Sequence, residues 1–150
     1  FYDPLPQRNY KGTLRISLFK LLEVAGVDAR SRLREFKNRG FFLVDTVKCR
    51  CRKDRSHPAR GVIRTCATKW LSLEVDHLGW PKRICILGDT ARMGLSEVKG
   101  CQQVGSHSVS RDCGQVAKCE KADVLIWPFP SWRTWKHYCS KVSVFRSFCS

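Results

Sequence analysis

The sequence predicts an α/β fold: a three-layer α/β/α sandwich around a short, mostly parallel central sheet. Three short and continuous apolar runs, each bounded by turn or charged residues, predict buried strands over residues 40–47, 83–88 and 123–130. Continuous rather than alternating apolar character is typical of parallel strands that are covered on both faces. Helical patterns separate the runs, so we expect the strands to pair in parallel through right-handed crossovers.

Apolar residues at helical spacing predict the helices around this sheet. Asp28 and Ser131 are the expected caps of the second and the last helix, and the fourth begins at Asp89 or Thr90. Residues 99–122 are rich in glycine, serine and cysteine and predict a loop or a short irregular strand. The predicted helices cover residues 13–26, 28–40, 57–79 and 88–95, and the last one carries Trp132, Trp135, Cys139, Val142 and Phe145 on one face.

Length and charge restrict the class of protein. The chain has 150 residues, 43% of them hydrophobic, which is enough for the core of one domain spanning residues 1–150. No apolar run approaches the roughly 20 residues of a membrane span. Lys and Arg number 28 against 13 acids, which gives a formal net charge of +15. Such a field attracts polyanions, so we expect a duplex or single-stranded nucleic acid as the partner; the alternative is a solvated basic surface. We also expect an intracellular monomer.

The nine cysteines do not predict a disulfide framework, because their number is odd and the sequence shows no signal peptide. Cys66, Cys85 and Cys139 fall within apolar patterns and are expected to be small buried hydrophobic residues. Cys49 and Cys51 have basic neighbours, which lower the pKa of a thiol and favour metal binding or reactivity.

Chemically active residues gather where the predicted strands end. The segments that follow the three strands are Asp45–Lys53, Gly88–Thr90 and Pro128–Arg133. In open parallel sheets, ligands bind beyond the carboxyl ends of the strands. The first segment brings a carboxylate, two cysteines and a cluster of Arg and Lys directly after an apolar run. The sequence therefore predicts a binding site at this edge of the sheet.

Four stretches, in this order, are similar to those of a known family: SLFKLLEVAGVD (17–28), VDTVKCRC (44–51), the segment 66–95, and PFPSWRT (128–134). Together they resemble the uracil-DNA glycosylase superfamily, most closely its iron–sulfur branch. The second stretch resembles the strand end that reads the base in that family, and the fourth resembles the loop that wedges into the DNA minor groove. The likeness extends from about residue 14 to residue 135.

This resemblance implies a DNA-repair glycosylase, which binds DNA and hydrolyses the N-glycosidic bond of a flipped, damaged base such as uracil. It implies catalytic positions at Asp45, where the family has Asn, and at Phe129, where the family has His. An ionised carboxylate only accepts hydrogen bonds, so Asp45 suits a base with an exocyclic amine better than uracil. The structural alternative for Asp45 is an ion pair with Lys48 or a nearby Arg.

The resemblance also implies the DNA contacts. In the loop after the third strand, Pro130 adds stiffness, Ser131 can bond a phosphate, and Trp132 or Phe129 can fill the gap that a flipped base leaves. The structural alternative is an ordinary strand-to-helix turn with Trp132 in the core. Basic residues expected to contact phosphates are Lys48, Arg50, Arg52, Lys53, Arg55, Arg133 and Lys136.

Several features depart from the family pattern. The family's water-activating loop has no counterpart here beyond the stretch FYDP, so we expect an N-terminally truncated domain with little or no uracil-excising activity by itself. Of the four cluster cysteines, the resemblance supplies Cys49 and Cys66; a [4Fe–4S] cluster needs four thiolates and is expected only if an upstream pair exists. The alternatives are a non-catalytic nucleic-acid-binding module, and a structural zinc protein using Cys101, Cys113 and Cys119, whose spacing matches no standard finger.

Overall fold

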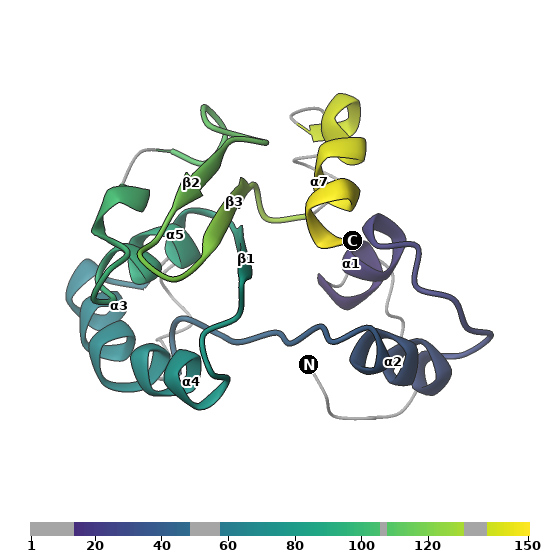
Figure 1. Ribbon diagram of the computed structural model, residues 1–150, viewed down its shortest axis with the longest axis horizontal. Helices are drawn as coiled ribbons and strands as arrows, with labels where there is room; N and C mark the ends of the chain where they lie inside the picture. The colour runs from purple at the N-terminus through teal and green to yellow at the C-terminus, as the bar shows by residue number, and fades with distance from the viewer. Residues whose placement is uncertain (1–13, 49–57, 106–107, 131–137) are drawn as a thin grey trace.

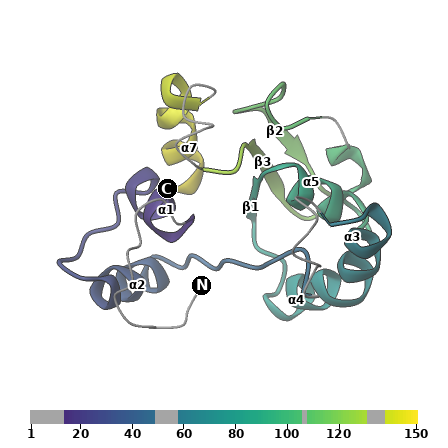
Figure 2. The same ribbon diagram turned by 180° about the vertical axis from the view of Figure 1, so that it is seen from behind.

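The structure is a computed structural model, and it describes residues 14–48, 58–105, 108–130 and 138–150. Its elements are α1 (Leu14–Leu21), α2 (Ala29–Asn38), α3 (Arg60–Cys66), η1 (Ala67–Leu71), α4 (Ser72–His77), β1 (Arg83–Leu87), α5 (Asp89–Ser96), η2 (Gln102–Val104), β2 (Val116–Lys118), β3 (Asp123–Trp127), η3 (Cys139–Lys141) and α7 (Val142–Cys149). The sheet lies between α3, α4 and α5 on one side and α1, α2 and α7 on the other (Figures 1 and 2). The predicted α/β fold is confirmed.

The three strands lie in the order β1-β3-β2. β1 and β3 pair in parallel, from Arg83 opposite Asp123 to Leu87 opposite Trp127. β2 adds to the other edge of β3 in the antiparallel direction. The parallel pair expected from the second and third apolar runs is therefore confirmed, and the short irregular strand expected between residues 99 and 122 is β2.

The sheet separates two apolar clusters, because successive side chains of a strand point to opposite faces. Val124 and Ile126 of β3 pack in the cluster that contains η1, α4 and α5. Leu125 and Trp127 pack in the cluster of α1, α2 and α7, where the ring centroids of Trp127 and Phe145 are 4.8 Å apart. Fully burying a side chain of this kind stabilises the fold by roughly 1.5 to 3 kcal/mol, so these clusters hold the three layers together.

Two predicted helices are confirmed with their local signals. α2 begins at the expected cap: the Asp28 carboxylate accepts a hydrogen bond from the Ser31 amide at 2.7 Å, and the Ser31 hydroxyl accepts one from the Asp28 amide at 3.1 Å. The helix predicted over residues 57–79 is α3, η1 and α4 in unbroken succession, with η1 as a π-helical turn. None of the described helices combines the length and the apolarity needed to cross a bilayer.

The strand predicted over residues 40–47 is wrong. Residues 41–48 are extended, yet they join no strand of the described sheet (Figure 1). Side-chain contacts hold this segment at both ends: the Phe41 ring packs on Phe36 with centroids 5.2 Å apart, and Lys48 Nζ lies 2.7 Å from Glu74 Oε2. These anchors fix the segment away from the free edge of β1.

The ends of two other helices differ from the prediction. The helix expected over residues 13–26 ends at Leu21, where the following residues leave the helical path. α5 has Gly88 at its N-cap position rather than Asp89 or Thr90. Gly88 has a φ of +95°, a conformation that glycine adopts without strain, and this frees the Asp89 carboxylate for another contact.

The last predicted helix is described from residue 138 onwards. Here η3 and α7 place Phe145 in the core at 1% exposure, and Val142 packs against the same cluster. The predicted cap Ser131 and the aromatic residues Trp132 and Trp135 lie outside the described residues.

The cysteines depart from the prediction at two places. Cys66 is buried as expected, but Cys139 is exposed, because it lies at the surface turn that begins η3. Cys101 and Cys119 form a disulfide with their Cα atoms 4.5 Å apart. This bond uses two of the three sulfurs of the zinc alternative, which is therefore wrong as proposed.

Candidate functional site

The carboxyl ends of β1 and β3 meet at one edge of the sheet. The Gly88 amide, directly after β1, donates to the Trp127 carbonyl at 2.8 Å. A Cβ atom at Gly88 would lie 3.3 Å from the Cβ of Phe129, so the backbone after β1 passes close beneath this side chain. Phe129 is 47% exposed. Two of the predicted strand-end segments therefore lie side by side.

The third strand-end segment reaches the same region without being a strand. A Cβ atom at Gly94 of α5 would overlap the Thr46 methyl group, so Thr46 lies directly on this helix. Asp45, the preceding residue, is exposed. Lys48, two residues further on, forms an ion pair with Glu74 of α4, whose partner atoms are 2.7 Å apart. The helices α4 and α5 thus place residues 45–48 beside the carboxyl edge.

A cavity of about 830 Å³ connects the three segments. Its walls are largely apolar, and they come from β1, from residues 41–47 and from α1 and α7. Asp89 supplies the one side-chain carboxylate among the described lining residues, whereas Asp45 is not part of the wall. At the carboxyl edge the lining residues are Thr46, Val47, Gly88, Asp89, Thr90, Val109, Ser110, Pro128 and Phe129. Apolar walls with a few polar groups are typical of pockets that bind small organic ligands.

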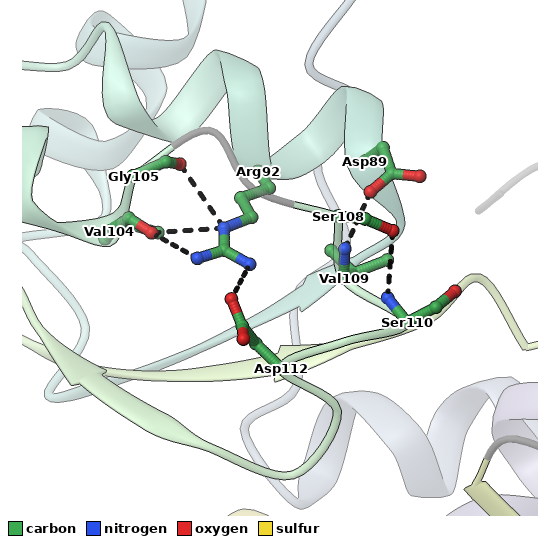
Figure 3. A network of polar contacts seen from close by, with 8 residues as sticks. All are labelled: Asp89, Arg92, Val104, Gly105, Ser108, Val109, Ser110 and Asp112. Atoms are coloured by element: carbon green, nitrogen blue, oxygen red, sulfur yellow. Dashed lines mark hydrogen bonds and ion pairs between the residues drawn. The ribbon is translucent and has the colours of Figure 1, made fainter.

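A polar network fixes the loop that follows η2 (Figure 3). The Arg92 guanidinium, on a residue that is 4% exposed, donates to the Val104 carbonyl at 2.8 Å and pairs with Asp112 at 2.7 Å. The Asp89 carboxylate accepts a hydrogen bond from the Val109 amide at 2.8 Å. A buried guanidinium needs such partners, because an unpaired charge in the interior is costly. The network therefore holds the wall around Val109 and the Asp89 side chain in one arrangement.

The described residues bring together only part of the predicted site. Phe129 lies at the cavity edge, Asp45 lies at the surface beside it, Lys48 is paired with Glu74, and Pro130 is buried. These placements leave the predicted roles as predictions. The remaining predicted DNA contacts lie outside the described residues: Arg50, Arg52, Lys53, Arg55, Ser131, Trp132, Arg133 and Lys136.

The predicted cluster ligands do not form a site in the part of the chain that the structure describes. Cys66 is 1% exposed at the end of α3, and Cys49 lies outside the described residues. Among the described side chains, no three His, Cys, Asp or Glu residues are grouped as ligands for a metal ion. Of the two predicted ligands the structure describes only Cys66, whereas a four-iron cluster needs four thiolates, so we assign no chemistry to such a group.

Two thiols line the cavity near the amino end of β1. Burial raises the pKa of Cys85 well above its usual value, and burial raises the pKa of Cys149 to about 11 although Arg83 and Arg39 act in the opposite direction. Burial also raises the pKa of Cys113. Raised values mean protonated thiols near neutral pH, which are poor nucleophiles and poor metal ligands. These cysteines therefore act as apolar packing groups.

Sequence reasoning missed the residues that hold the site in place. Thr46, Gly94, Arg92 and Asp112 had no assigned role. The available signal was Gly94 itself, since a glycine inside a helical pattern often marks a close approach of another segment. The Arg92 pair had no local signal, because its partner lies on a loop that the pattern left unassigned.

A cavity at the carboxyl ends of a parallel strand pair is typical of α/β proteins that bind a ligand there. The family model described as the uracil DNA glycosylase superfamily matches residues 7–148. The chain belongs to the uracil DNA glycosylase superfamily. The comparison with curated proteins gave no match, and neither did the comparison with solved structures.

Proposed function

We propose that this chain is a single glycosylase domain, which binds DNA and hydrolyses the N-glycosidic bond of a flipped, damaged base. The observation that carries the proposal is the convergence of three strand-end segments on one cavity in a member of this superfamily. Members of the superfamily act on DNA, and the net charge of +15 favours a polyanionic partner.

The cavity is the proposed receptor of the flipped base. Flipping costs a few kcal/mol, which contacts to the base must offset. The Phe129 ring, half exposed at the edge, offers an aromatic face for stacking, and Asp45 offers an acceptor beside the opening. An acceptor alone favours a base that carries an exocyclic amine over uracil. The proposed substrate class is therefore a damaged base with an amino group, with uracil as a poor substrate.

Asp89 is the proposed residue that positions the water. Its carboxylate lines the cavity, and its hydrogen bond from the Val109 amide at 2.8 Å fixes the orientation of the group. A positioned carboxylate that activates water contributes typically about a hundred- to ten-thousandfold to a rate.

Phosphate contacts are proposed for the basic residues after residue 47 and for the residues that follow Pro130. Lys48, whose side chain is partly exposed in its ion pair with Glu74, would exchange this partner for a phosphate. Such contacts set affinity and register but not base preference.

The test uses duplexes with a single site that carries a damaged base with an exocyclic amine, uracil, or an undamaged base. We expect slow formation of abasic sites at the damaged positions, scored by strand breakage in alkali. Asp89→Asn keeps an acceptor for the Val109 amide and loses the charge, so the rate should fall by about a hundredfold or more while binding stays unchanged. Equal rates for the two proteins would remove Asp89 from the mechanism.

A non-catalytic nucleic-acid-binding module is the second candidate. The observation that favours it is the placement of two residues: Asp45 lies outside the cavity wall, and the Phe129 side chain has no donor for the departing base. Loss of one such donor typically costs about a hundred- to thousandfold in rate. Binding of damaged duplex without any abasic product would support this module.

Asp45→Asn tests the base-reading role. An amide can both donate to and accept from uracil, so the variant should bind a uracil-containing duplex more tightly, by up to about tenfold, and improve the rate less. Fluorescence anisotropy measures the affinity, and an undamaged duplex serves as the control. Unchanged affinity for both duplexes would place Asp45 outside the recognition site.

Salt dependence tests the phosphate contacts. With about five to seven contacts, the logarithm of the binding constant should fall against the logarithm of salt concentration with a slope of roughly −4 to −6 on duplex DNA. A titration from low to moderate salt measures the slope. A slope near zero would contradict DNA binding altogether.

A further inference from the structure

We propose that Gly94 is a positioning residue for the base-reading segment 45–48: the absence of its side chain lets Thr46 seat on α5 and thereby places Asp45. The inference rests on the proposed function, because it assumes that Asp45 reads the base. Gly94 touches neither DNA nor base in this proposal and acts only through Thr46.

The contact is close enough to exclude any side chain at residue 94. A Cβ atom built there would overlap Cγ2 of Thr46, and it would lie 3.2 Å from Cβ and 3.4 Å from Oγ1 of the same residue. The overlap with a branched side chain next to the backbone cannot be relieved by rotating a distant group. An added methyl group must therefore push residues 45–48 away from α5 or distort the helix.

The helix itself gives no reason for a glycine at this position. Gly94 is buried in the interior of α5, and its φ lies outside the left-handed region. In a helix interior, glycine is less favourable than alanine because it loses more conformational freedom on folding. The close approach of Thr46 is the structural feature that an alanine would disturb.

Thr46 is the anchor of this segment that lies next to Asp45, and further upstream Leu43 packs against the cluster of α1, α2 and α7. Phe41 packs on Phe36 at one end, and Lys48 pairs with Glu74 at the other, with 2.7 Å between the charged atoms. No strand of the described sheet holds the segment between these two ends. The contact of Thr46 with α5 is the one next to Asp45, so it holds Asp45 in place most directly.

The same helix carries Asp89 at its first residue. The contact of Thr46 with α5 thus fixes the distance between the proposed base-reading carboxylate of Asp45 and the proposed water-positioning carboxylate of Asp89. Displacement of reacting groups by about 1 Å can cost roughly a hundredfold in rate. Gly94 links the two halves of the site in this way.

The experiment compares Gly94→Ala with a matched control, Gly61→Ala. Gly61 lies in α3 and a Cβ atom there would meet nothing within 4 Å, so this variant makes the same chemical change without the overlap. The rescue variant Gly94→Ala with Thr46→Ala removes Cγ2 and makes room for the new methyl group. Two measurements are made: amide hydrogen exchange of residues 41–48, and the ratio of affinities for damaged and undamaged duplex.

We expect Gly94→Ala to speed exchange in residues 41–48 and to lower the affinity ratio by about ten- to a hundredfold through the lost hydrogen bond to Asp45, with less than about a twofold change for undamaged duplex. Gly61→Ala should match the wild type, and the double variant should recover most of both losses. If Gly94→Ala behaves like Gly61→Ala, or the double variant is not rescued, the proposal is wrong.

Folding failure and failure of the proposed function give different results. If Gly94→Ala alone does not fold, the double variant decides: a folded protein with the wild-type ratio supports the overlap as the cause, and an unfolded one contradicts it. If the wild type itself shows no preference for damaged duplex, the proposed function fails, and the exchange measurement still decides whether Gly94 holds the segment.

Discussion

The two sides of β1 differ, although a continuous apolar run of the sequence lies on each side. On one side β3 pairs with β1 in parallel over five residue pairs, from Arg83–Asp123 to Leu87–Trp127. On the other side a cavity of about 830 Å³ lies between β1 and the extended residues 41–47. Both neighbours are continuous apolar runs in the sequence.

This difference shows that a continuous apolar run indicates burial on average, but it does not indicate whether the backbone of the run pairs with a strand. β3 is buried on both faces, as Val124 and Leu125 are each 0% exposed. In the run at residues 41–47, Phe42 is 65% and Val44 is 37% exposed. Contacts with α2, α4 and α5 hold this second run, and its side chains serve the cavity and the surface instead of a sheet.

The largest expected effect is a difference in the free energy of unfolding between a substitution in β3 and a substitution in residues 41–47. Trp127→Ala should lower the free energy of unfolding by about 3 to 5 kcal/mol, because the ring is 0% exposed and packs against Phe145. Phe42→Ala should change it by less than about 1 kcal/mol. Urea unfolding measures both. A loss for Phe42→Ala as large as that for Trp127→Ala would break the comparison, since it would make residues 41–47 part of the core.

A somewhat smaller loss of stability is expected for variants that release the loop after η2, which contains Val109 and Asp112 and lies at the carboxyl end of β1. Arg92→Met should cost about 3 kcal/mol, because it leaves Asp112 without its 2.7 Å partner in a largely buried place. Asp89→Ala removes only the bond to the Val109 amide and should cost about 1 kcal/mol. Urea unfolding of the two variants checks the order. Arg92→Met combined with Asp112→Leu should cost clearly less than the sum of the single changes, and simple additivity would contradict a direct pairing.

The smallest effect is the pH dependence of stability that comes from Cys149, and it shows whether water reaches the cavity beside β1. The pKa of Cys149 is raised to about 11 from an ordinary value of 9.0, so the folded protein keeps a proton that the unfolded chain has lost. This contribution to stability is complete below about pH 9 and is lost as the pH rises through about 11. The pH dependence of Cys149 alkylation measures the value, and Cys149→Ser is the control for the stability curve. A midpoint near 9 would mean that water reaches this thiol.

Local signals accounted for most of the fold that was predicted correctly. The cap of α2 involves Asp28 and Ser31, three residues apart, and the parallel pair β1–β3 follows from two uninterrupted apolar runs with helices between them. The position of residues 41–48 depends instead on Phe36, on Glu74 and on α5, and the last two are distant in the sequence. No pattern within the run itself indicates these partners.

The site was predictable in outline for the same reason. Strand ends that carry polar residues indicate an edge, so Gly88–Thr90, Phe129 and the residues after Val44 were expected to lie together. Sequence could not show that Asp45 lies beside the cavity and not in its wall, because contacts with Phe36, Glu74 and α5 place this segment instead of strand pairing. It also could not show that Asp89 accepts a bond from Val109, since that depends on how the loop after η2 folds back.

The Cys101–Cys119 bond changes what a single cut in the chain would do. Arg111 and Lys118 lie between the two sulfurs, so a protease that cleaves after either one leaves two fragments joined by a covalent bridge. The carboxyl-terminal fragment keeps β3 and α7 and stays tethered beside the rest of the sheet. In denaturing gel electrophoresis the cleaved molecule would therefore migrate as one band, and a reductant would be needed to separate the two fragments.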